Sequence, residues 1–136
     1  MKSIFVRGRN CLLLTADFSP LFVDYYLHLM QHGLRHEEAV DTTLKQILAL
    51  FTLHLVSRPW KEYHAWTFNL REPGPANYFV SGSSTDEEVI GRAFTKDVKL
   101  HESNMLFAQN LLPGRDPQTS VIVLHGSTVP EWVEDY

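Results

Sequence analysis

Two segments of alternating apolar and polar residues, joined by a Glu-Pro-Gly-Pro corner, constrain the fold of this chain most. Residues 62–70 and 76–81 both have the period of two that is typical of a strand with one buried face. Proline followed by glycine suits the centre of a tight turn, so the sequence predicts an antiparallel hairpin here. The side chains expected on its buried face are Trp66, Phe68 and Leu70 on the first strand, and Tyr78 and Val80 on the second.

Two helices are expected before this hairpin. The first begins at a capping Asp17 or Ser19 and ends at Gly33. Its apolar residues fall three and four apart, which places them on one face. The second helix runs from about His36 to Val56, and its second half is apolar on nearly all sides, which predicts burial. The apolar face of the first helix consists of Leu21, Phe22, Tyr25 and Leu29.

Further strands are expected on both sides of these elements. Residues 4–15 form a strand that is broken or bent at Gly8, and three strands follow the hairpin at 89–95, 104–111 and 119–125. The sequence therefore predicts an α+β fold in which mostly antiparallel sheets pack against two N-terminal helices.

The 136 residues are expected to form a single domain, residues 1–136. Near the end, Thr128 and Glu131 have the spacing of a capping box, which predicts the start of a helix. Few residues follow, and they leave the apolar face of that helix without cover. We therefore expect the domain to be truncated within its last helix, or Trp132 and Tyr136 to contact a partner or a second copy.

Charge and cysteine content exclude several classes of protein. The net charge is -4, which is unsuited to wrapping nucleic acid or docking on anionic lipid. The single cysteine, Cys11, excludes an internal disulfide and a four-cysteine zinc site, and its apolar surroundings predict a buried thiol. The longest apolar stretch, residues 47–56, is too short to cross a bilayer. We expect a cytoplasmic protein with neither a membrane nor a nucleic-acid partner.

No motif predicts catalysis or a cofactor. Three histidines, His28, His32 and His36, are spaced four apart, but Gly33 interrupts the helix that would align them on a metal. The acidic residues 86–88 lack the ligand spacing of a calcium loop. We therefore expect no metal, no cofactor and no catalytic residue. An enzyme with an unrecognised pocket is an alternative, for which the candidate residues are His54, His64 and His125.

The central hairpin region holds more aromatic residues than one sheet face can bury. Tyr63 and Phe79 are expected on the face opposite Trp66. Either a second layer covers that face, or it is an exposed apolar patch that binds something. The candidate binding residues are Tyr63, Phe79, Trp60 and Phe94.

Four segments occur in an order that resembles a known family. They are FVRG at residues 5–8, the GP turn at 74–75, VIGRA at 89–93, and VIVLHGSTVPEWVEDY at 121–136. This arrangement is similar to the N-terminal domain of the redox-regulated 33-kilodalton heat-shock chaperone, and the resemblance covers essentially the whole chain. Two features depart from the family: Ile90 stands where the family has arginine before the strand glycine, and the turn is poorer in glycine.

The resemblance implies a stress-response holdase, an ATP-independent chaperone that binds unfolded or misfolded proteins through apolar surface. It also allows a homodimer. In the family, a C-terminal domain with four cysteines binds zinc and controls this surface by redox state. The present chain has one cysteine, so the resemblance implies the client-binding body without the zinc switch. The alternative is a non-enzymatic interaction or structural subunit that uses the same fold for one fixed partner.

Overall fold

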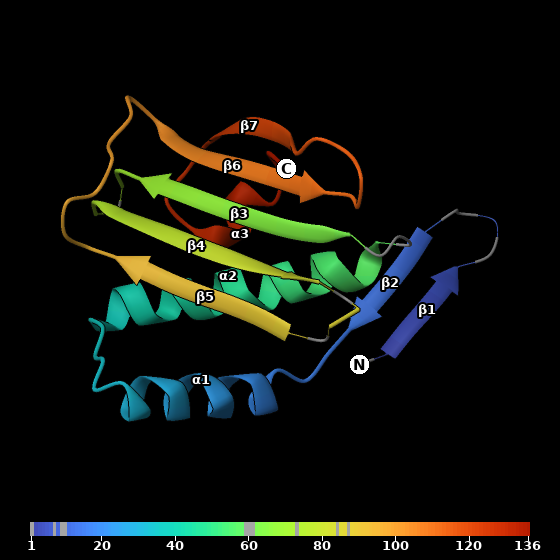
Figure 1. The fold of residues 1–136 in the computed structure, drawn as a ribbon, viewed down its shortest axis with the longest axis horizontal. Coiled ribbons are helices and arrows are strands. Elements are labelled where there is room, and N and C mark those ends of the chain that lie inside the picture. Colours follow the sequence, from blue (N-terminus) through green and yellow to red (C-terminus); the bar gives the residue numbers. More distant parts are fainter. Residues whose placement is uncertain are drawn as a thin grey trace. The chain divides into compact units, whose positions relative to one another are not determined.

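The computed structural model describes residues 2–6, 8, 11–58, 62–72, 74–83, 85–86 and 88–136 (Figure 1). Its contacts divide the chain into two compact units, Met1–Glu38 and Ala39–Tyr136. The first unit holds a β-hairpin and one helix, and the second holds a larger sheet with a long helix. That the chain acts as one domain stays a prediction.

In the first unit, β1 (Lys2–Val6) pairs antiparallel with β2 (Cys11–Thr15). The predicted break at Gly8 is therefore a complete reversal of the chain, and this glycine has a positive φ of 78°. Helix α1 (Ser19–Gln31) follows. At its start, the carboxylate of Asp17 accepts hydrogen bonds from the Ser19 N–H at 3.0 Å and the Ser19 hydroxyl at 2.7 Å.

The exposure of side chains in this unit supports the predicted apolar face of α1 and corrects the prediction for Cys11. The four residues predicted to share the apolar face of α1 are all half-buried, whereas Val23 and Met30, on other sides of the helix, are exposed. The prediction of a buried thiol is wrong, because Cys11 is exposed. Its strand belongs to a two-stranded sheet, which is too small to bury both of its faces.

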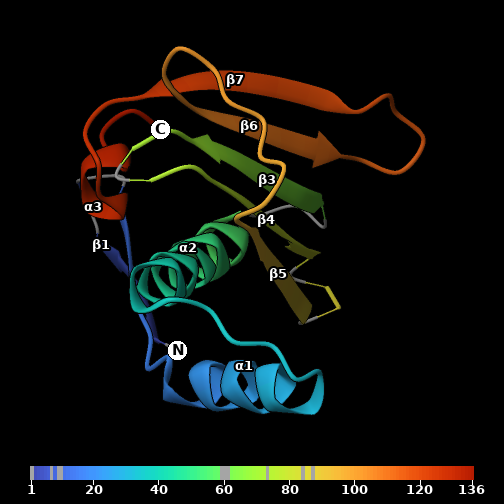
Figure 2. The same ribbon diagram turned by 90° about the vertical axis from the view of Figure 1, so that its left-hand side faces the viewer.

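The second unit is built on a five-stranded antiparallel sheet with the order β5-β4-β3-β6-β7. In Figure 1 this sheet lies in front of α2 (Glu38–Ser57), and Figure 2 shows it curling around that helix. With three helices in the described part of the chain, the fold is α+β, as predicted. The strands are β3 (Tyr63–Leu70), β4 (Ala76–Ser83), β5 (Glu88–Phe94), β6 (Asn104–Leu111) and β7 (Gln118–Leu124), and α3 (Val129–Trp132) follows them.

The core of this unit lies between α2 and the inner face of the sheet. Phe51 and Ile47 of α2 are fully buried, and the Phe51 ring lies 5.0 Å from the ring of Trp66, edge to face. Phe68 and Val80 complete the inner face beside Trp66, so the predicted alternation of β3 and β4 is confirmed. By length and composition α2 could also cross a membrane, a test that core helices pass as well.

Two glycines allow α2 and the strands to approach one another closely. A Cβ atom on Gly91 of β5 would lie 2.8 Å from Cδ2 of Leu48. A Cβ atom on Gly82 of β4 would collide with the backbone carbonyl of Glu88 and would lie 3.2 Å from Cδ1 of Leu55. Any larger residue at these two positions would push the strands and the helix apart.

The predicted start of the last helix at Thr128 is confirmed. The carboxylate of Glu131 accepts hydrogen bonds from the backbone N–H of Thr128 at 2.9 Å and from that of Ser127 at 2.8 Å. These bonds lower the pKa of Glu131, because they stabilise its charged form. The Glu131 carboxylate therefore binds the two backbone N–H groups that immediately precede the helix, as one half of the predicted capping box.

Trp132 is not available to a partner, contrary to the sequence-based expectation. Its side chain is 3% exposed, and its ring lies 5.9 Å from that of Phe68. Its indole N–H donates to the carbonyl of Gly126 at 3.2 Å. Trp132 is covered by the sheet of its own chain, because the chain turns back toward that sheet at Gly126.

Replacing Gly82 with alanine should destabilise the second unit by roughly 1–3 kcal/mol, since the added methyl group meets the fixed backbone of β5. Urea or thermal unfolding followed by circular dichroism measures this change. The matched control is Gly74→Ala in the β3–β4 turn, where nothing lies within 4 Å of the added atom. An equal effect of both substitutions would contradict the close packing of β4 on β5.

Candidate functional site

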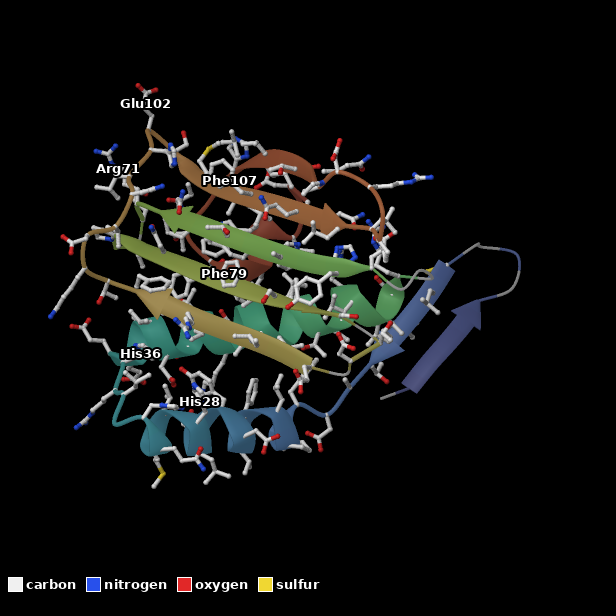
Figure 3. The ribbon with its side chains drawn as sticks, viewed as in Figure 1. His28, His36, Arg71, Phe79, Glu102 and Phe107 are labelled. Carbon is white, nitrogen blue, oxygen red and sulfur yellow. The ribbon has the colours of Figure 1, made fainter. Side chains whose placement is uncertain are left out.

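The candidate site lies on the outer face of the sheet, the side turned away from α2. A row of side chains crosses this face at the middle of the strands. Thr67 of β3 pairs with Phe79 of β4 on one side and with Phe107 of β6 on the other. Arg92 continues the row beyond Phe79, and Val121 continues it beyond Phe107. Figure 3 shows Phe79 and Phe107 on the same side of the sheet.

Apolar side chains of this outer face are exposed to solvent. Val121 on β7 is 57% exposed, Ile90 on β5 is 51% exposed and Tyr63 on β3 is 40% exposed. Single exposed apolar residues are common, but a group of them on one face indicates a binding surface. The exposed apolar residues of the outer face are Tyr63, Ile90, Phe94, Leu111, Val121 and Val123.

A groove of about 560 Å³ runs over the centre of this face. Its shape follows from the sizes of neighbouring side chains, because the small Thr67 on the central strand lies between two phenylalanines on the flanking strands. Phe79, Phe107 and Phe94 line the groove together with several amide and hydroxyl groups. Four of its lining residues are phenylalanine or tyrosine and the other seven are polar, so the groove offers aromatic surface together with hydrogen-bonding groups, a combination found in binding sites.

The segment 95–103, which crosses from β5 to β6, forms one wall of the groove, and two asparagines on the outer face hold it. In the amide orientation that satisfies both of its ends, Asn77 accepts from the backbone N–H of Lys99 at 3.1 Å and donates to the Lys99 carbonyl at 3.2 Å. The amide nitrogen of Asn69 lies 3.1 Å from Nε2 of His101. Asn77 therefore pairs with the loop much as a neighbouring strand would.

A third asparagine closes the end of the sheet next to this wall. The side-chain oxygen of Asn104 accepts from the backbone N–H of Arg71 at 2.7 Å and from that of Glu72 at 3.1 Å. The guanidinium of Arg71 reaches the carbonyl of His101 at 3.4 Å. The turn between β3 and β4 and the segment 95–103 are thus tied to the same strand end.

The structure brings two of the four candidate client-binding residues together at the groove. Phe79 and Phe94 line the groove, and Tyr63 lies on the same outer face. Trp60 lies outside the described residues. Sequence reasoning missed Phe107, and the residues around it show why: Met105, Leu106 and Phe107 are consecutive apolar or aromatic residues, so β6 gives no clear period of two.

Tyr136 lies next to a pair of histidines on the inner side of the sheet. The rings of His54 on α2 and His64 on β3 are 5.0 Å apart, and the ring of Trp66 is 4.9 Å from that of His54. The Tyr136 hydroxyl is 3.4 Å from Nε2 of His54. Tyr136 is 52% exposed, so its role as a partner or dimer contact stays a prediction.

Burial dominates the titration of both histidines. Burial, followed by the neighbouring His64 and Arg58, lowers the pKa of His54 to about 4. Burial also lowers the pKa of His64, although the Glu62 carboxylate, 3.1 Å from Nε2, acts in the opposite direction. The third histidine of the enzyme hypothesis, His125, is exposed and instead faces Asp135, with Nδ1 2.9 Å from Oδ1.

The three N-terminal histidines do not share one helix. The rings of His28 and His32 lie 4.4 Å apart, but α1 ends at Gln31 and His36 lies beyond Gly33. Among the residues that the structure describes, no three histidine, cysteine or acidic side chains gather as metal ligands.

No protein-family model, curated protein or solved structure matches this chain significantly.

Acid should destabilise the second unit through His54. Because the pKa of His54 is about 4 when folded and 6.5 ordinarily, the unfolded chain binds the proton more readily. The contribution of neutral His54 to the stability is therefore fully present above pH 6.5, and it is lost as the pH falls from 6.5 toward 4. In His54→Phe this pH dependence of the unfolding midpoint should become shallower, with His64 and, near pH 4, Glu131 and Asp135 supplying what remains.

Thermal unfolding at pH 7, 6, 5 and 4 measures the effect. His32→Gln, which changes the exposed histidine immediately after α1, separates the loss of a buried histidine from the loss of any histidine. An unchanged slope in His54→Phe would show that His54 does not carry the effect.

Proposed function

We propose that the second unit is the client-binding body of an ATP-independent holdase, which binds unfolded polypeptide on the outer face of its sheet. The observation that carries this proposal is the exposure of apolar side chains on one side of a sheet whose other side forms the core. The groove between Phe79 and Phe107 gives this face a defined place for a segment of client chain.

The physical basis is the burial of apolar surface, which is favourable and non-directional. A client segment that covers about 300 Å² of apolar surface gains roughly 7 kcal/mol before the cost of ordering its chain. Much of that gain offsets the lost freedom of the client, so binding is weak and reversible. Such binding accepts many sequences and needs neither a nucleotide nor a catalytic residue.

The motif order supports the same proposal, because it resembles the N-terminal domain of the redox-regulated 33-kilodalton heat-shock chaperone. Under this proposal, the α+β fold is a version of that domain, and the protein is a cytoplasmic stress-response chaperone. The family's zinc switch needs four cysteines, and this chain has one. The proposed client surface therefore works without a redox switch in this chain and without zinc.

Light scattering of a heat-unfolded client protein tests the proposal. The wild-type chain at a few-fold excess should suppress the rise in scattering. The double variant Phe94→Ser with Val121→Ser should lose most of this suppression, because it removes two exposed apolar side chains from β5 and β7. Both side chains are about half exposed, so the fold should tolerate the change.

The matched control is Val23→Ser with Met30→Ser, which removes two exposed apolar side chains from α1 instead. It should suppress aggregation as the wild type does. If the wild type fails to suppress aggregation, the holdase proposal is rejected. If both double variants lose suppression equally, the outer face is not the client-binding site. Saturable binding to one protein, without activity toward general clients, would select the alternative of a subunit with a fixed partner.

A further inference from the structure

We propose that the groove prefers client segments in which acidic side chains flank the apolar ones. This inference rests on the holdase proposal and names the class of client that the outer face selects. It comes from the charged groups around the groove. These are cations, whereas the chain as a whole has a net charge of -4.

The first observation is the position of Lys99. It lines the groove, whereas no aspartate or glutamate is among the described lining residues. Asn77 fixes its backbone through two hydrogen bonds, so the root of the side chain has a defined place on the wall. Its ammonium group has no ion pair within the described part of the chain. A cation without an ion pair, whose backbone is held beside an apolar surface, is suited to pair with an anion on a ligand.

The second observation is Arg92, which is exposed on the same face and also has no ion pair among the described residues. Arg92 and Phe94 lie two residues apart on β5, so their side chains share the outer face. Phe94 in turn pairs with Asn77, the residue that holds Lys99. Phe94 therefore has Arg92 beside it on its own strand, and the backbone of Lys99 is bonded to its cross-strand partner Asn77.

The nearby carboxylates do not neutralise this arrangement. Glu88 shares the outer face but lies at the other end of β5 from Phe94. Glu102 belongs to the segment that walls the groove, and Figure 3 shows it pointing outward, away from Phe79 and Phe107. Asp97 lies in the same segment without lining the groove. A chain with a net charge of -4 thus presents cations around its apolar groove, which is charge complementarity toward acidic clients.

Fluorescence anisotropy with two labelled peptides tests this preference. The peptides have equal length and the same apolar centre, and one carries Asp and Glu on its flanks where the other carries Lys and Arg. The wild-type chain should bind the acidic peptide roughly fivefold more tightly at low salt, as expected for exposed charge pairs. The preference should fade as salt is raised, because exposed charges are screened.

Two double variants complete the experiment. Arg92→Gln with Lys99→Gln should bind the two peptides about equally, whereas Arg58→Gln with Arg115→Gln, which removes the same charge elsewhere, should keep the preference. Equal binding of both peptides to the wild type overturns the charge preference and leaves the holdase proposal standing. A preference that survives in Arg92→Gln with Lys99→Gln overturns the assignment to these two cations. Failure of the wild type to bind either peptide, together with failure to suppress aggregation, overturns both proposals.

Discussion

The packing of α2 into the curl of the five-stranded sheet is the interaction on which the second unit depends. Leu48 and Leu55 approach the strands where Gly91 and Gly82 have no side chains, and Phe51 packs edge to face on Trp66. These contacts bury five apolar residues of α2, and on the sheet they use only the inner face. A single helix covers one side of a sheet, so the arrangement that forms the core also leaves the outer face for another role.

An exposed apolar sheet face carries a risk of self-association, and polar groups on and around it limit that risk. Arg92 and Glu88 lie on the edge strand β5, where charges hinder pairing with a second copy. The segment 95–103 crosses the strand ends and is held there by Asn69 and Asn77. The face is therefore a bounded groove beside a wall of loop residues, and under the proposed function a client segment would meet a limited apolar area with cations beside it.

Much of this architecture follows from local pattern. The period of two on either side of the Pro-Gly turn predicts the pairing of β3 with β4, and the dense apolar run predicts α2 as the core helix. Pattern fails where the outcome depends on what lies opposite a residue. Cys11 is exposed because its sheet has two strands, and Trp132 is buried because the chain turns back at Gly126.

The groove is harder to predict than the strands that form it. Phe107 lies in a strand that is apolar on both faces, so its sequence gives no sign of which side chains point outward. The wall depends on hydrogen bonds from Asn69 and Asn77 to a segment far along the chain, which carries no period of its own. Side-chain size across three strands and contacts distant in sequence set the shape of the groove, and neither is encoded in a single stretch of residues.

A binding face on the middle of a sheet has a consequence for affinity. The backbone of Thr67 is fixed on both sides, by Phe79 on β4 and Phe107 on β6, and the residues of the inner face hold β3 against α2. The surface is therefore ordered without a ligand, so any chain that binds it would cost the protein little conformational freedom. Under the proposed function, nearly all of the entropic cost would belong to the client chain. Affinity should then follow the apolar content and the charge of the client segment, which is the behaviour that a holdase for varied unfolded chains requires.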